Sequence, residues 1–276
     1  MTKPAAGPPR AVIAVLGLGE AGSHIAADLY AAGAVVRGFD PRVPAGAGVI
    51  ACADDADACR GADVVLSLTT AHEAVGALKA SLPGLAPAAI YADLNTSSSG
   101  LKRTLAALAR DAGVDRFADV ALMSPVPGKG LRTPMLASGP GADDYARLLC
   151  GLGASVEVLA APPGAAADRK LVRSVFFKGL AAAVTESLRA ARAAGCEDWI
   201  RDSIAAELSA ASADTVDRLE RGSIQHAARR AEEMAASAAL LQELGVPPRI
   251  ATASQQWLRQ LLSERDQGEP GDVTIC

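Results

Sequence analysis

A glycine-rich turn near the start of the chain has the residue types and spacing of a dinucleotide phosphate site. Gly17, Gly19 and Gly22 form a Gly-x-Gly-x-x-Gly pattern after the apolar run 12–16, and a helical pattern follows through Tyr30. The first glycine permits a tight turn, the second lets a pyrophosphate approach the backbone, and the third brings the helix close to the strand. The unpaired N–H groups of the helix start would bind the phosphates.

An acidic residue follows at the distance where such a site meets the adenosine ribose. A second apolar run, 34–39, ends in Asp40, about 20 residues beyond the glycines. A carboxylate there accepts hydrogen bonds from the ribose hydroxyls and repels the 2′-phosphate of NADP, so we expect NAD(P) binding with a preference for NAD. Arg42 works against this preference, because a guanidinium can pair with the phosphate.

Two later strand ends carry polar residues that should face the same cofactor. Thr69 follows the apolar run 62–68, and Asn95 and Thr96 follow the run 89–94. Ligands of open parallel sheets bind outside the carboxyl ends of the strands. The predicted cofactor-binding residues are therefore Gly17, Leu18, Gly19, Glu20, Ala21, Gly22, Asp40, Thr69, Asn95 and Thr96.

A cationic segment opens a long helical pattern and supplies a candidate for proton transfer. Lys170, Arg173 and Ser174 lie within one helical turn and can face one cleft. A lysine beside a nicotinamide can hold a substrate carboxylate, or transfer a proton at the substrate hydroxyl. From the spacing alone, a solvated helix start with i,i+4 charges is the alternative interpretation.

A second candidate pair lies farther along the helical region. His226 and Arg230 are spaced i,i+4 on one predicted helix, 224–244, and could reach a substrate in this subunit or in a partner subunit. A surface charge cluster that includes the acidic residues at 232 and 233 is the alternative interpretation.

The pattern of elements divides the chain into two predicted domains. Strand-like runs alternate with helical patterns up to Pro163-Gly164, which predicts an α/β, Rossmann-type doubly wound sheet over residues 1–164. From residue 165 the pattern is helical for almost the rest of the chain, beginning with one long helix over 165–194 and continuing in shorter helices punctuated by Gly222 and Gly245. Residues 165–276 are therefore predicted to form a long interdomain helix and an all-α domain.

Composition excludes several classes of partner. The 27 Lys and Arg residues face 31 Asp and Glu residues, and the formal net charge of −4 disfavours binding to nucleic acid or to an anionic membrane. The five cysteines are scattered and never spaced as Cys-x-x-Cys, which argues against a disulfide framework and against a metal site. We therefore expect a reduced, cytoplasmic location, a small-molecule substrate, and no nucleic-acid or membrane partner.

These segments together resemble a known family. Residues 12–40, 93–96, 119–128 and 170–174 are similar to those of the β-hydroxyacid dehydrogenases, relatives of 6-phosphogluconate dehydrogenase. The resemblance implies an N-terminal nucleotide-binding domain, a long interdomain helix and an all-helical C-terminal domain. It also implies that Lys170 is the catalytic residue, and that the protein is a homodimer built through its helical region.

The chain departs from the family pattern around the expected substrate. The two asparagines that follow the family's lysine are replaced by Arg173 and Ser174, and the substrate loop Ala-Pro-Val-Ser-Gly-Gly is altered at residues 124–129. We assign Pro127, Gly128, Arg173 and Ser174 to substrate binding, together with His226 and Arg230. The changes indicate a divergent bacterial branch with its own type of C-terminal domain.

The predicted function is hydride transfer between a nicotinamide cofactor and a small carboxylate-bearing hydroxy or keto substrate. The architecture also resembles that of the imine reductases, so reduction of a C=N substrate is an alternative. The resemblance implies that imine reductases usually carry another residue at this position, so Lys170 favours alcohol and ketone chemistry. A dinucleotide-binding protein that has lost turnover is the non-enzymatic alternative.

Overall fold

The computed structural model describes residues 10–267, and the chain divides into two compact units after Arg173. The first unit contains an eight-stranded sheet, with β1 at Val12–Leu16, β2 at Val35–Phe39, β3 at Val49–Ala51, β4 at Val64–Ser67, β5 at Ile90–Asp93, β6 at Phe117–Leu122, β7 at Met135–Ser138 and β8 at Val156–Val158. Its helices are α1 at Glu20–Ala31, α2 at Asp55–Cys59, α3 at Ala74–Ser81, α4 at Ser99–Asp111 and α5 at Ala142–Gly151.

The strand order places a topological switch point beside the glycine-rich turn. The strands lie in the order β3-β2-β1-β4-β5-β6-β7-β8, and every neighbouring pair is parallel except β6 and β7. β1 pairs with β2 on one side and with β4 on the other, so the chain winds outward in both directions from β1. This arrangement confirms the predicted doubly wound α/β class, and it directs a ligand to the carboxyl ends of β1 and β4.

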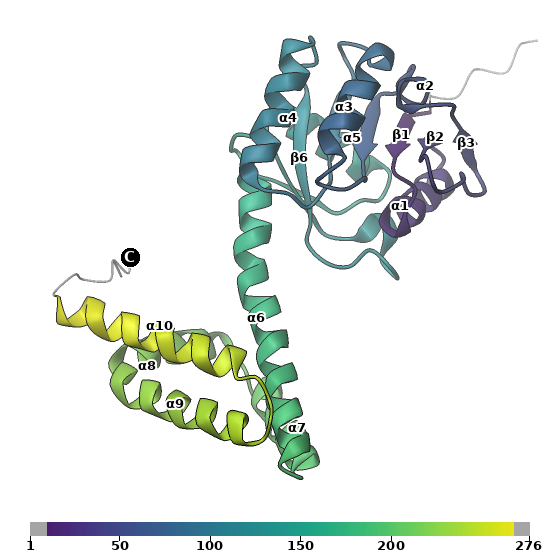
Figure 1. Cartoon of the computed structure of the whole chain (residues 1–276). Coiled ribbons are helices and arrows are strands. Elements are labelled where there is room, and N and C mark those ends of the chain that lie inside the picture. The colour runs from purple at the N-terminus through teal and green to yellow at the C-terminus, as the bar shows by residue number, and fades with distance from the viewer. Residues whose placement is uncertain (1–9, 268–276) are drawn as a thin grey trace, which may run out of the picture. The chain divides into compact units, whose positions relative to one another are not determined.

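Helices cover both faces of the sheet, and the central strands are therefore apolar on both faces. Ile25 and Leu29 of α1 and Tyr145 of α5 pack on one face, while Leu78 of α3 and Leu105 of α4 pack on the other. Figure 1 shows α3 and α4 side by side over the sheet. All four residues of β4 are buried, as expected for a parallel strand covered on both faces.

The helix α6, Ala165–Ala193, is continuous for 29 residues, as the sequence predicted. The boundary between the two compact units falls inside this helix, after Arg173. At an ordinary rise of 1.5 Å per residue, its length is about 43 Å. Gly195, with a φ of +74°, follows its end and supplies the left-handed backbone that commonly stops a helix.

The second unit contains the rest of α6 and four further helices, α7 at Glu197–Ser209, α8 at Ala213–Gln225, α9 at Ala227–Glu243 and α10 at Arg249–Asp266. α9 and α10 pack along each other, as Figure 1 shows. The carboxylate of Glu186 in α6 accepts hydrogen bonds from the N–H groups of Ile250 and Ala251, and so satisfies the first turn of α10. Within residues 10–267 no helix is long and apolar enough to cross a membrane.

The predicted helix break near Gly222 was wrong, because α8 continues to Gln225 and His226 is its C-cap. Gly222 lies inside α8, and a Cβ atom added to it would be 2.9 Å from the guanidinium of Arg230, so glycine here makes room for a side chain. His226 instead joins α8 to α9 with φ −111° and ψ 24°. His226 is thus the N-cap of α9 rather than a residue inside the helix, and its carbonyl accepts the first i,i+4 hydrogen bond of α9, from the Arg230 N–H at 3.0 Å.

Candidate functional site

The three glycines of the turn meet different structural demands. Gly17 has a φ of +91°, and a Cβ atom there would lie 2.5 Å from the Leu68 carbonyl oxygen. A Cβ atom on Gly22 would lie 1.9 Å from the Gly17 carbonyl oxygen, so these two glycines let strand, turn and helix pack closely. At Gly19 an added Cβ atom would meet nothing within 4 Å. The backbone at Gly19 is therefore open to a phosphate.

The start of α1 has the polarity that a pyrophosphate needs. Gly19 is the N-cap of this helix and provides no side-chain hydrogen bond, and Glu20 and Ala21 begin the first turn. Leu18, between the glycines, is buried. Unpaired N–H groups and the positive end of the helix dipole favour an anion at this position.

Asp40 closes the turn from the end of β2. Its Oδ2 atom accepts the Leu18 N–H at 2.8 Å, and its Oδ1 atom accepts the N–H groups of Arg42 and Val43 at 2.8 and 3.0 Å. Partial burial raises the pKa of the Asp40 carboxyl, but these three hydrogen bonds and the charge of Arg42 outweigh it, so the pKa lies below its ordinary value. Asp40 is therefore ionised at neutral pH.

A cavity of about 400 Å³ lies beside Asp40, within the range of small-molecule sites. Its lining includes Gly17, Asp40, Arg42, Asp55, Thr69 and Glu73. Three of these side chains are carboxylic acids and one is a guanidinium. The glycine turn, the ionised carboxylate and the adjoining cavity together fit the adenosine and phosphate groups of a dinucleotide.

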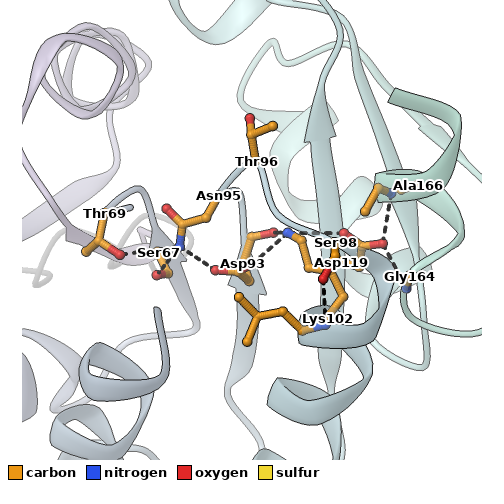
Figure 2. A network of polar contacts seen from close by, with 12 residues as sticks. Ser67, Thr69, Asp93, Asn95, Thr96, Ser98, Lys102, Asp119, Gly164 and Ala166 are labelled. Carbon is orange, nitrogen blue, oxygen red and sulfur yellow. Dashed lines mark hydrogen bonds and ion pairs between the residues drawn. The ribbon is translucent and has the colours of Figure 1, made fainter. Parts of the chain in front are cut away.

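A buried ion network lies next to this site, under the loop that follows β5 (Figure 2). The Lys102 side chain of α4 is 1% exposed, and its Nζ atom lies 2.6 Å from Asp93 Oδ2 and 3.2 Å from Asp119 Oδ1. It also donates to the Asp93 carbonyl at 2.7 Å. Burial raises the pKa of Asp93, against the opposing effect of Lys102. The network joins α4, β5 and β6.

One branch of the network orients Asn95. Asp93 Oδ1 accepts from Asn95 Nδ2 at 2.5 Å, and the same amide nitrogen lies 3.2 Å from Ser67 Oγ and 3.3 Å from Thr69 Oγ1. The amide nitrogen is thereby turned into the network. Asn95 Oδ1 is buried and has no hydrogen-bond partner within residues 10–267, so it can accept one from a bound cofactor.

The other branch holds the start of α6. Asp119 Oδ2 accepts from the N–H groups of Gly164 and Ala167 at 2.9 and 3.2 Å, and from Ser138 Oγ at 3.2 Å. Ser138 Oγ in turn accepts the Ala166 N–H at 3.2 Å. Asp119 thus serves as a helix cap that comes from β6, at a distance of about 45 residues in sequence.

Lys170 reaches the loop after β5 from the second turn of α6. Its Nζ atom donates to Thr96 Oγ1 at 2.7 Å. One turn later, Arg173 donates from a guanidinium nitrogen to the Met123 carbonyl at 2.9 Å. The structure therefore brings Lys170, Thr96, Arg173 and the beginning of the 123–130 loop together.

The 123–130 loop is tied down at both ends. Leu131, just beyond the loop, donates its N–H to Asp28 of α1 at 2.8 Å, and Lys129 Nζ donates to Ser124 Oγ at 3.1 Å. Pro127 and Gly128 are exposed between these anchors, and Gly128 has a φ of +79°. These two predicted substrate-binding residues therefore lie at the tip of the loop.

The remaining predicted substrate residues belong to the second unit. Ser174 is its first residue. Arg230 donates to Ser223 Oγ at 3.1 Å and lines a largely apolar cavity of about 680 Å³ with Phe176 and Trp257. His226 is exposed at the junction of α8 and α9.

Comparisons with known proteins agree with this arrangement. Residues 12–128 match the family model described as the NAD binding domain of 6-phosphogluconate dehydrogenase, and residues 191–261 match the Domain of unknown function (DUF1932). A protein from Mycobacterium tuberculosis named probable 3-hydroxyisobutyrate dehydrogenase is 35% identical over 140 residues, which are 48% of this chain and 46% of that protein. The chain thus spans about half the length of the curated relatives it matches.

Solved structures extend the similarity over nearly the whole chain. A conserved hypothetical protein from Sinorhizobium meliloti 1021 is 30% identical with a TM-score of 0.59, and the match covers 95% of this chain and 92% of that chain. An imine reductase from Myxococcus stipitatus in complex with NADP+ is 17% identical with a TM-score of 0.76 and coverage of 93% and 95%, which shows a shared fold alone.

Residues 12–128 belong to the family of NAD-binding domains of 6-phosphogluconate dehydrogenase, and residues 191–261 belong to the DUF1932 family. The first match supports binding of a nicotinamide dinucleotide, and the second gives the C-terminal helices a domain type of their own. The predicted family resemblance and fold are confirmed. The roles of the individual site residues stay predictions.

The ion network was not predicted from the sequence. Asp93 and Asp119 were noted only within the segments that resemble the family, and Lys102 had no predicted role. A signal was present, because Lys102 lies three residues before Leu105 and seven before Ala109, on the apolar stripe of α4. A lysine on such a stripe must find partners when the helix packs.

Two glycine substitutions should separate phosphate binding from folding. We expect Gly19→Ala to cost about 1 kcal/mol of stability or less, because the added methyl group meets nothing, yet to weaken dinucleotide binding at least roughly tenfold by occupying the space of the phosphates. Gly22→Ala should cost about 1–3 kcal/mol or more, because its Cβ atom collides with the Gly17 carbonyl. Thermal unfolding and isothermal titration with NADH measure both effects.

Gly151→Ala in α5 is the matched control, since an added Cβ atom there also meets nothing within 4 Å and the residue lies away from the turn. It should change neither property. Unaltered NADH affinity in Gly19→Ala would contradict the assignment of the turn to phosphate binding.

Proposed function

We propose that the protein transfers a hydride between a nicotinamide dinucleotide and a small carboxylate-bearing hydroxy or keto substrate. The observation that carries the proposal is the hydrogen bond of 2.7 Å between Lys170 Nζ and Thr96 Oγ1, because it holds an amine beside the loop predicted to contact the cofactor. Family membership and the open backbone at Gly19 support the cofactor part of the proposal.

Each residue has a role that follows from its chemistry. When bound, the nicotinamide dinucleotide supplies or accepts the hydride. Lys170 accepts the proton that leaves the substrate hydroxyl during oxidation, and returns it to the oxygen during reduction. Thr96 holds the amine in place, and the guanidinium of Arg173, one turn away and anchored at Met123, adds the positive charge that attracts a carboxylate.

The same geometry favours oxygen over nitrogen at the reacting carbon. A C=N group is reduced readily as the iminium cation, and an ammonium at Lys170 would repel that cation. A carbonyl oxygen instead gains negative charge during reduction, which the ammonium stabilises. Reduction of imines is therefore the second candidate, and the similarity to imine reductases supports it through the fold only.

Lys170→Ala should lower kcat roughly 10²- to 10⁴-fold, the usual contribution of a positioned acid or base, and should leave dinucleotide affinity nearly unchanged. The assay is cofactor oxidation or reduction with a panel of hydroxy acids, keto acids and cyclic imines. Arg169→Ala, an exposed cation at the neighbouring position, is the matched control and should keep near-wild-type kcat.

Near-wild-type turnover in Lys170→Ala would move the chemistry to another residue. Turnover of the imines alone would select the second candidate function. Tight dinucleotide binding without turnover of any compound in the panel would favour the non-catalytic alternative.

We also propose that the cofactor is NAD rather than NADP. Asp40 is ionised, and Asp55 and Glu73 line the same cavity, so a 2′-phosphate would meet several carboxylates. We expect NADH to bind at least roughly tenfold more tightly than NADPH in a fluorescence titration. Asp40→Ser should narrow this difference, and Arg42→Ala should weaken NADPH binding while NADH binding stays the same. Tighter binding of NADPH to the wild type would overturn the proposal.

The helical region supports a proposed homodimer. Phe176, Trp199 and Trp257 of the second unit are 60%, 70% and 59% exposed, and Phe176 and Trp257 line one cavity. Large apolar side chains that are exposed together on one surface are typical of an interface. Light scattering at micromolar concentration should report the mass of two chains. Trp257→Glu should shift the population toward the monomer, whereas Gln256→Glu, at the neighbouring exposed position, should not. A monomeric wild type would contradict the proposal.

A further inference from the structure

The ammonium of Lys102 is held between one backbone carbonyl and two carboxylates. Its Nζ atom donates a hydrogen bond to the Asp93 carbonyl at 2.7 Å, and it forms ion pairs with Asp93 Oδ2 at 2.6 Å and Asp119 Oδ1 at 3.2 Å. The side chain is 1% exposed, so water does not compete for these positions. Lys102 therefore fixes the relative positions of β5 and β6 where the two strands carry their carboxylates.

The network contacts the first turn of α6 through the carboxylate of Asp119. Two carboxyl groups share one ammonium, so a buried carboxylate at Asp119 needs further hydrogen-bond donors. The N–H groups of Gly164 and Ala167 point at Asp119, at the positive end of the α6 dipole. A shift of α6 would take these donors away from a buried carboxylate, so the network resists that shift.

The two branches of the network end on both sides of the proposed reaction site. Through Asp93 it orients the amide of Asn95, whose neighbour Thr96 accepts the hydrogen bond from Lys170. Through Asp119 it holds Ala167, one turn before Lys170 on the same helix. The contacts thus form a closed ring that begins and ends at Lys102.

From this ring we infer that Lys102, Asp93 and Asp119 are positioning residues for the reaction. Asp93 sets the amide of Asn95 for the dinucleotide, and Asp119 sets the first turn of α6 and thereby Lys170. The inference rests on the proposed function, in which Lys170 transfers the proton. An apolar side chain at position 102 could fill the space, but it would hold neither carboxylate in a defined direction.

The ring predicts separable effects for its two branches. Asp119→Asn should lower kcat roughly 10- to 100-fold, the usual effect of a small displacement of a catalytic group, with less than about a threefold change in the dissociation constant for NADH. Asp93→Asn should instead weaken NADH binding by roughly three- to tenfold, because Asn95 loses its charged acceptor. Ser138→Ala removes one hydrogen bond to Asp119 and should lower kcat by a smaller factor than Asp119→Asn.

Leu105→Ala is the matched control, since it removes a fully buried side chain one turn from Lys102 on α4 without touching the ring. It should lower the melting temperature, and below that temperature leave kcat and NADH affinity within about twofold of the wild type. If the control and the Asp variants change kcat and NADH affinity alike, the ring is merely structural and the inference is overturned. Where Asp119→Asn fails to fold, Ser138→Ala provides the same comparison.

A second measurement tests the effect of the ring on Lys170 and does not require catalytic turnover. In the protein without cofactor, the acylation rate of Lys170 as a function of pH, followed by peptide mass spectrometry, reports the surroundings of its amine. Asp119→Asn and Ser138→Ala should shift this profile in the same direction, and Leu105→Ala should leave it in place. An unshifted profile overturns the inference. A shifted profile together with no turnover in the wild type would overturn the proposed function alone.

Discussion

The arrangement of the N-terminal unit depends on the contact of the Lys102 ammonium with the carboxylates of Asp93 and Asp119. These groups are buried between α4, β5 and β6, and every one of their charged atoms has a partner. Removing one member of a buried ion network typically costs about 3–5 kcal/mol, because it leaves an uncompensated charge. Such a network is a weak source of stability, but it is a strong constraint on geometry.

That constraint acts at the edge of the sheet where parallel strands end. A doubly wound sheet directs ligands to this edge, yet the loops that follow each strand are free to take many conformations. In this protein Asp93 fixes the loop after β5 by holding Asn95, and Asp119 fixes the segment that leads into α6. The sheet therefore sets the position of the site, and the buried charges fix the conformation of the segments that line it.

In the proposed cofactor site, the glycine turn contributes its backbone and Asp40 contributes a charged side chain. Gly17 and Gly22 are required by backbone contacts, whereas Gly19 leaves space for a ligand. Asp40 accepts three backbone N–H groups, which fixes the shape of the turn and keeps the carboxylate ionised. One residue thus serves both the fold and the electrostatics of the proposed ribose site.

The sequence by itself determined the succession of strands and helices along the chain, the continuous α6, the glycine turn with Asp40, and the family resemblance. These features depend on local patterns, namely apolar runs, helical periodicity and fixed spacing, which are written along the chain. It also singled out Lys170 and Thr96, but only the tertiary structure brought their side chains to 2.7 Å.

The helix break at His226 and the network around Lys102 were decided by tertiary contacts alone. A glycine at position 222 is typical of a helix end, yet Gly222 lies inside α8, where its missing side chain leaves room for Arg230. Lys102 is of a residue type usually found at the surface, and it can be buried on α4 because Asp93 of β5 and Asp119 of β6 meet its ammonium. The place of Lys102 on the apolar stripe of α4 indicates that it is buried, but its two carboxylates come from different strands, so the pairing appears only when the sheet has formed.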